Sequence, residues 1–240
     1  IENIKKINPK RVVLISTIAV YNQPFDVDED TVINEEESTT YGRNRRILEV
    51  WVEQNYKDSL VVRLPGIYGI NLKKNFLYDM INVIPAMLTE AKYNELASES
   101  ALVKENYVMQ DNGFAKCTAV DKELRKQLKA EFRKFGFTAL LFTDSRGIFQ
   151  YFHLGQLWLL IEKALENNIC VLNVAVEPVT IGEIYNYVHD GKEFVNELNK
   201  PVPHFDFKTK HTDIFGGQNG YILDKYTCLK QIKEFIIEES

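Results

Sequence analysis

The chain has 240 residues, of which 45% are hydrophobic, 12% aromatic and 26% charged, and its formal net charge is −5 at pH 7. This length corresponds to one large domain or two small ones, and the composition excludes a disordered or fibrous chain. No run of about 18 uncharged apolar residues is present, so no membrane-spanning helix is expected. The acidic balance argues against a broad nucleic-acid-binding face.

Two buried strands and a helix between them open the chain. The apolar run Val12–Ile15 predicts a strand buried on both faces. Ser38 or Thr39 is a suitable N-cap for a helix that continues to about Tyr56, and Leu60–Val62 predicts the next strand. Strand, helix and strand in this order predict a parallel βαβ unit.

The rest of the chain also alternates between strands and helices. The periodicity between residues 75 and 116 is mixed and assigns no elements, whereas 121–135 and 154–165 have the apolar spacing of amphipathic helices. A third strand is expected at 170–174 and a last helix at about 224–237. The fold class is therefore α/β.

The cysteines and histidines point to no metal centre. Cys117, Cys170 and Cys228 are far apart and odd in number, which fits neither a disulfide framework nor a zinc spacing. The four histidines have no ligand spacing either, so no metal is expected. Unpaired cysteines are typical of a reducing compartment, which predicts a cytoplasmic protein.

A hydroxyl at a strand end and a tyrosine near a helix start form the main candidate site. Thr17 follows the first strand, and open parallel sheets bind ligands at that edge. Tyr41 and Arg45 are four residues apart and share a helix face. A guanidinium beside a phenol favours the phenolate, so Tyr41 would exchange a proton at a carbinol or carbonyl oxygen that Thr17 holds.

Three segments in order resemble extended short-chain dehydrogenases/reductases, the NAD-dependent epimerase/dehydratase family. They are Ser16–Tyr21, Tyr41–Arg45 and Arg63–Gly69. The resemblance implies a partial Rossmann-like parallel sheet with flanking helices, together with a smaller mixed substrate-binding region. Residues 1–75 would form the second half of the Rossmann-like domain, and residues 76–240 the substrate-binding region and the α/β elements that return to the sheet.

The same resemblance implies roles for individual residues. Those implied as catalytic are Thr17, Tyr41 and Arg45. Those implied to bind NAD or NADP are Ser16, Tyr41, Arg45, Leu64, Pro65 and Ile67. Those implied to bind substrate are Thr17, Gly66, Asn75, Arg146 and Gln150.

Several positions depart from the family pattern. Arg45 stands where the family has a lysine, and Gly66 stands where sugar-nucleotide members often have an asparagine. Ile18 and Ala19 replace the Asp-Glu pair of dehydratases, which argues against dehydration by this chain. Phe149 occupies the place of an arginine that binds diphosphate. Arg146, slightly upstream, is either its substitute or a surface or ion-paired arginine.

The glycine-rich turn that binds the cofactor pyrophosphate is missing, because the first glycine is Gly42. By resemblance, Ile1 falls after the fourth family strand, and Val12–Ile15 becomes a sheet edge. Another chain would then cover that edge, the fragment would have rearranged, or a segment is absent from the sequence. A homodimer through the Tyr41 helix or the Val12–Ile15 edge is expected.

Two functions are left open. One is an NAD(P)-dependent oxidoreductase or epimerase that acts on a sugar or nucleotide sugar, a small-molecule substrate. The other is a non-catalytic C-terminal portion, a binding or assembly module without a cofactor site.

Overall fold

A three-stranded parallel sheet is the centre of the protein, which is represented by a computed structural model that describes residues 1–73 and 75–239. Its order is β1 (Val13–Thr17), β2 (Leu60–Leu64) and β9 (Val171–Asn173). Val13 pairs with Leu60 and Thr17 with Leu64, so β1 and β2 end at the same edge. The parallel βαβ unit expected from the sequence is confirmed.

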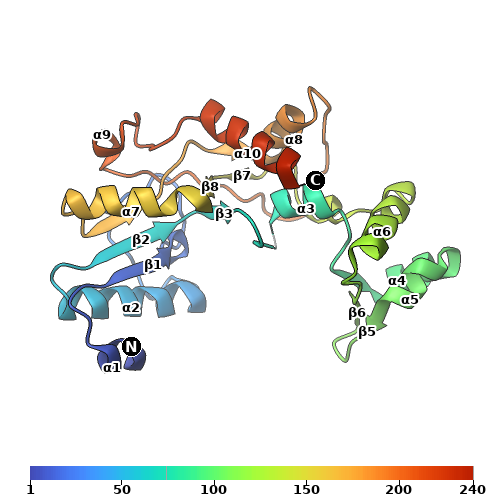
Figure 1. Cartoon of the computed structure of the whole chain (residues 1–240), viewed down its shortest axis with the longest axis horizontal. Coiled ribbons are helices and arrows are strands. Elements are labelled where there is room, and N and C mark those ends of the chain that lie inside the picture. Colours follow the sequence, from blue (N-terminus) through green and yellow to red (C-terminus); the bar gives the residue numbers. More distant parts are fainter. Residues whose placement is uncertain (74, 240) are drawn as a thin grey trace.

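Helices cover both faces of this sheet (Figure 1). On one side α2 (Thr40–Asn55) packs Val52 against the first two strands, and on the other α7 (Leu157–Glu166) packs against β2 and β9. All five residues of β2 are buried, as a central strand between two helices requires. The Thr39 side chain accepts a hydrogen bond from the Gly42 amide at 3.1 Å, which is the N-cap predicted for α2.

The outer edge of the sheet is formed by β1. Within the described residues β1 pairs with β2 alone, and Ile15 in the middle of the strand is 38% exposed. The short helix α1 (Glu2–Ile7) precedes it and packs Ile4 against the α2 side of the sheet. The edge position predicted for Val12–Ile15 is therefore the one observed.

A second core lies beyond the carboxyl ends of the strands. Tyr68, Leu77 and Ile232 are among its buried residues. It is built from two small strand pairs, β3 with β8 in parallel and β7 with β10 antiparallel, and from three helices. The bounds of these elements are β3 (Gly66–Tyr68), α3 (Phe76–Asn82), β7 (Ile148–Phe149), β8 (Tyr151–His153), β10 (Val179–Thr180), α8 (Ile181–Val188) and α10 (Lys225–Glu239).

Residues 84–137 form a third unit, here called the distal module, which lies on the far side of α3 from the parallel sheet (Figure 1). Its antiparallel sheet has the order β4-β6-β5, and Leu128 and Phe132 are fully buried in its own core. The Ala139 amide donates to the Val83 carbonyl at 2.8 Å, so the two ends of the module meet. Its elements are β4 (Met87–Thr89), α4 (Glu90–Glu99), α5 (Ala101–Asn106), β5 (Tyr107–Met109), β6 (Phe114–Cys117) and α6 (Lys122–Lys134).

Short turns and helices connect these units. They are η1 (Ile18–Val20), η2 (Ala139–Phe142), η3 (Leu154–Gln156) and α9 (Thr212–Phe215). In the described part of the chain no helix has the length and apolar character needed to cross a bilayer.

Candidate functional site

Thr17 lies at the carboxyl end of β1, where the strand turns into η1. Its hydroxyl oxygen accepts a hydrogen bond from the Ala19 amide at 3.2 Å, which caps η1 and fixes the side chain at the strand end. Thr17 is half-buried. Among the described residues its hydroxyl donates no hydrogen bond, so this donor is available to a ligand.

Gly42 brings the start of α2 against this turn. A Cβ atom at residue 42 would overlap with the carbonyl oxygen of Ala19, so only glycine allows the first helical turn to pack this closely. The close approach puts the residue before it, Tyr41, at the same edge of the sheet as Thr17.

Tyr41 and Arg45 share a helix face but point to different partners. The Tyr41 side chain is 60% exposed, and its hydroxyl has no hydrogen-bond partner in the described part of the chain. The Arg45 Nη2 donates to the carbonyl oxygen of Ile15 on the open edge of β1, and its Nε is buried without a partner. No hydrogen bond among the described residues joins Tyr41, Arg45 and Thr17 to one another.

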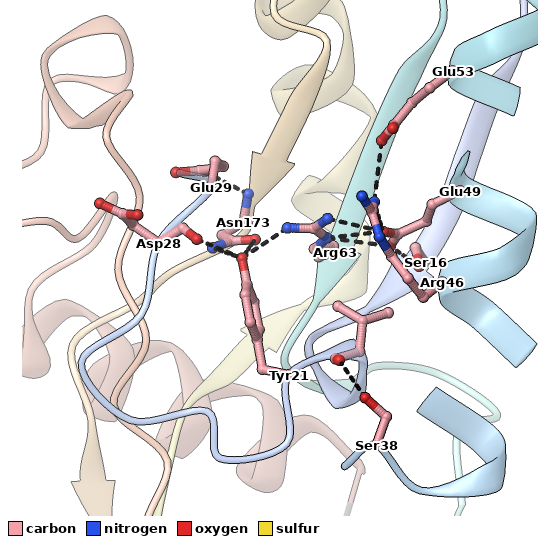
Figure 2. Close-up of polar contacts among 11 residues, drawn as sticks. Ser16, Tyr21, Asp28, Glu29, Ser38, Arg46, Glu49, Glu53, Arg63 and Asn173 are labelled. Carbon is pink, nitrogen blue, oxygen red and sulfur yellow. Dashed lines mark hydrogen bonds and ion pairs between the residues drawn. The ribbon is translucent and has the colours of Figure 1, made fainter. Parts of the chain in front are cut away.

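A buried ion pair joins α2 to β2 (Figure 2). Glu49 on α2 is fully buried and accepts from Arg63 Nη2 at 2.8 Å, while Arg63 on β2 is 2% exposed. Ser16 donates to Glu49 Oε1 at 2.5 Å, and Arg46 Nη1 lies 3.0 Å from Glu49 Oε2. Ser16 is thus held inside a polar network rather than presented to solvent.

The network continues to Tyr21 on the other side of β2 (Figure 2). Arg63 Nη1 donates to the Tyr21 hydroxyl at 2.7 Å, and that hydroxyl donates to the Asp28 carbonyl at 2.6 Å. Burial raises the pKa of Tyr21 despite the nearby Arg63, so the phenol stays neutral. Asn173 on β9 donates to the same oxygen at 3.0 Å. The network therefore ties all three strands to the loop after β1.

A cavity of about 350 Å³ opens beyond the end of β2 and next to η1. Pro65, Gly66, Asn75 and Gln150, four residues predicted to bind cofactor or substrate, all line it. Leu64 is buried in the core of the parallel sheet, and Ile67 is half-buried against that core. Five aromatic side chains also line it: Phe76, Phe149, Tyr151, Phe205 and Phe207.

Two of the polar cavity residues are already saturated by the chain. Gln150 is 2% exposed, and its amide nitrogen donates to the carbonyls of Val176 at 2.6 Å and Phe207 at 2.9 Å. Its oxygen accepts from the Phe207 amide at 3.0 Å. Asn75 donates to the Ile67 carbonyl at 2.8 Å and caps α3. Both residues position the cavity wall rather than offer free polar atoms.

Arg146 lies outside this cavity and is neutralised. Its Nη2 is 2.8 Å from Asp144 and its Nη1 is 2.9 Å from Glu197. The Arg146 hydrogen bonds hold the pKa of Asp144 well below its usual range, so the pair stays charged. This geometry matches the ion-paired alternative for Arg146 rather than a free arginine waiting for an anionic substrate.

Two features of the site escaped the sequence reasoning. Glu49 lies on the sheet-facing side of α2, eight residues after Tyr41. An acidic residue at a buried position of the helix was the signal that could have identified it. Phe205 and Phe207 reach the cavity from a loop distant in sequence, and no local pattern places them there. Among the described residues, no group of three or more His, Cys, Asp or Glu is arranged to hold a metal ion.

Comparisons with known proteins place the fold. No protein-family model and no curated protein matches the chain. Solved structures do match: the Bordetella bronchiseptica enzyme WbmG in complex with NAD has 16% identity and a TM-score of 0.54 over 97% of this chain. The UDP-glucuronic acid 4-epimerase of Bacillus cereus in complex with NAD has 14% identity and a TM-score of 0.53 over 99% of this chain.

A reductase matches equally well. The dTDP-4-dehydrorhamnose reductase of Bacillus anthracis in complex with NADP has 14% identity and a TM-score of 0.53 over 95% of this chain. The chain thus shares its fold with these NAD- and NADP-bound proteins, and the fold that the sequence resemblance predicted is confirmed. The chain spans 62%, 64% and 64% of the length of these three structures, respectively.

Proposed function

We propose that the chain is part of an NAD(P)-dependent oxidoreductase or epimerase, an isomerase in the latter case, that acts on a sugar or nucleotide sugar. The observation that carries the proposal is the aromatic cavity beyond β2, which joins Pro65, Gly66 and Asn75 next to the turn after Thr17. Open parallel sheets bind ligands at this edge. The similar structures, solved with NAD or NADP, support the same chemistry, and their greater length supports a longer protein.

In this proposal each side chain has a separate task. A bound nicotinamide would accept or supply hydride at a carbinol carbon. Tyr41 holds or releases the proton at the carbinol oxygen, and the Thr17 hydroxyl donates a hydrogen bond to that oxygen. Arg45 would bind the cofactor ribose. Its Nε is buried and has no hydrogen-bond partner among the described residues, so it would donate to a ribose oxygen. Pro65 and Leu64 would contact the nicotinamide ring.

The Tyr41→Phe variant tests the assignment in the complete protein. Removal of the hydroxyl should abolish most turnover with the sugar substrate and leave the circular dichroism spectrum and the melting temperature unchanged. Tyr56→Phe, at the other end of the same helix, is the matched control. Unchanged turnover in Tyr41→Phe would overturn the catalytic role.

A second candidate function is a non-catalytic binding or assembly module. It is favoured by the open edge of β1 and by the absence, among the described residues, of a hydrogen bond between Tyr41 and either Thr17 or Arg45. Titration of NADH and NADPH against the 240-residue chain, followed by nicotinamide fluorescence, separates the two. Micromolar binding supports a cofactor site on this chain, and no binding supports the module.

We also propose a homodimer and a cytoplasmic location. The two candidate contact faces are the β1 edge, which pairs with no second strand among the described residues and exposes Ile15, and the exposed Ile47 on α2. Cys170 is exposed and unpaired, which fits a reducing compartment. A monomer in solution scattering at high protein concentration would exclude the dimer.

A further inference from the structure

A groove lined by cations separates the distal module from the second core. Five basic residues of α6 line it, and Ile81 and Asn82 of α3 form the opposite wall. Figure 1 shows α6 beside α3 and the C-terminal end of α10. The five basic residues are Lys122, Arg125, Lys126, Lys129 and Arg133.

Their spacing puts these five side chains on one face of the helix. Successive members are one, three or four residues apart, which at 3.6 residues per turn confines them to an arc of about 100°. The acidic residues Glu123 and Glu131 fall on the remaining circumference, and Leu128 and Phe132 bury the side that faces the module core. The stripe is therefore uninterrupted by acidic residues.

Among the described residues, no carboxylate forms an ion pair with the stripe. Arg125 and Lys129 are half-buried, yet within residues 1–73 and 75–239 neither forms an ion pair. Arg125 donates through Nη1 to the Ala119 carbonyl at 3.1 Å, which fixes the guanidinium and leaves its other donors unused. Burial, with Arg133 and Arg125 nearby, lowers the pKa of Lys129. Glu239 of α10 is the one acidic residue in the described groove wall.

Like charges this close destabilise a helix unless a counter-charge binds between them. The ion pairs elsewhere show the contrast, because Arg63 and Arg146 each have carboxylate partners. A cationic wall without ion pairs among the described residues, in which Arg125 and Lys129 are half-buried and the other three cations are exposed, is suited to an anion rich in oxygen atoms, such as a phosphate. Tyr78 and Asn82 add neutral donors.

The groove also adjoins the aromatic cavity. Asn75 lines both spaces, and the groove beside it has a volume of about 500 Å³, the size of a small-molecule site. A ligand can thus place a charged end against α6 and an uncharged ring against Phe205. Arg146 cannot supply that charge because Asp144 and Glu197 already hold it.

We propose that the groove between α6, α3 and α10 binds the phosphate groups of a diphosphate ester, whose uncharged end extends past Asn75 into the aromatic cavity. The distal module would then supply the positive charge that the rest of the chain neutralises. That this ester is the substrate rests on the proposed function, whereas phosphate binding by the groove does not.

Calorimetric titration of the 240-residue chain with inorganic pyrophosphate tests the groove without any cofactor or turnover. Pyrophosphate should bind, more weakly as the salt concentration rises, and Lys122→Gln/Lys129→Gln should weaken it about tenfold or more. Lys116→Gln/Lys134→Gln is the matched control, because it removes the same charge from exposed positions outside the groove. Circular dichroism checks folding, and Lys122→Gln alone serves if the double variant unfolds.

Absent pyrophosphate binding, or equal weakening in both double variants, overturns the phosphate site. UDP tests the second half of the proposal. Phe205→Leu should weaken UDP about fivefold, since it removes an aromatic face, and leave pyrophosphate binding unchanged. Equal UDP affinity in Phe205→Leu overturns the extension into the cavity. Because none of these readouts needs turnover, unchanged turnover in Tyr41→Phe would overturn the proposed function and leave the phosphate site untouched.

Discussion

The parallel sheet and the distal module differ in whether their basic side chains form ion pairs with carboxylates. In the sheet, Arg63 is buried between two helices, and Glu49 meets it with a direct ion pair and several hydrogen bonds. In the module, Lys129 and its neighbours on α6 gather on a half-exposed face with no carboxylate partner among the described residues. Inside a core an unpaired charge costs too much to keep, whereas at a groove it can be retained for a ligand.

The largest expected effect comes from breaking the buried ion pair in the parallel sheet. Glu49→Ala leaves the Arg63 guanidinium buried without its partner, and the free energy of unfolding should fall by about 3–5 kcal/mol. Urea unfolding measures it. Glu53→Ala is the control, since Glu53 is partly exposed and 3.4 Å from Arg46, and it should cost at most about 1 kcal/mol. Equal losses of unfolding free energy in the two variants would show that the buried ion pair stabilises the fold no more than the partly exposed one.

The second prediction tests whether the module has its own core. Phe132→Ala removes a fully buried ring next to Tyr107 and should destabilise the module by about 3–5 kcal/mol. Hydrogen exchange should then lose protection in residues 84–137 while β2 keeps it. Phe114→Ala, at a 41% exposed position, is the control and should change little. Simultaneous loss of protection in β2 would mean that the two units unfold as one.

A third prediction concerns a carboxyl that lies between the two regions. Burial raises the pKa of Asp79 on α3 from 3.8 to about 6, and it has no ion-pair partner among the described residues. The folded chain keeps a proton that the unfolded chain loses, so this contribution is full below about pH 4 and disappears as the pH rises to about 6. Stability should fall by about 2 kcal/mol across that window, allowing for partial exposure.

Asp79→Asn should flatten this part of the pH profile of unfolding, because the amide carries no charge at any pH. Asp111→Asn, in an exposed turn of the module, should leave the profile unchanged. An Asp79→Asn profile that falls between pH 4 and pH 6 as steeply as the wild-type profile would contradict the assignment.

The smallest expected effect comes from removing one of the unpaired charges on α6. Lys126→Gln relieves repulsion from Lys122 and Lys129, so it should raise the stability of the module by about 0.2–0.5 kcal/mol at low salt and by nothing at high salt. Thermal melts at two salt concentrations measure the difference. Lys134→Gln lies three residues after Glu131 and should not stabilise the module, so a gain in both variants would refute the repulsion.

The sequence predicted the parts of the fold that local signals control. The α2 helix begins after the Thr39 cap as expected, and β1, β2 and β9 overlap the apolar runs that predicted them, although β1 and β2 each continue two residues further. The prediction that the first strand is buried on both faces is wrong, because Ile15 is exposed at the sheet edge. The elements between residues 75 and 116 were not assigned, because strands of three or four residues, such as Met87–Thr89, are too short to show a period. Tertiary packing decides such segments.

The candidate site was predictable only in part, for a similar reason. Pro65, Gly66 and Asn75 share a cavity because they are close in sequence to one strand end. Arg146 and Gln150 each have one partner far along the chain, Glu197 at a separation of 51 residues and Phe207 at 57, and no spacing rule foresees these two contacts. The pairing of Glu49 with Arg63 likewise becomes visible only once α2 is packed on β2.

The hydrogen bond between Ala139 and Val83 has a consequence for how this architecture is inherited. A segment whose entry and exit touch can be excised or transplanted as a cassette, because a tight turn can rejoin the host chain. The distal module, residues 84–137, thus constitutes a replaceable part, whose exchange would leave the parallel sheet and its flanking helices as they were.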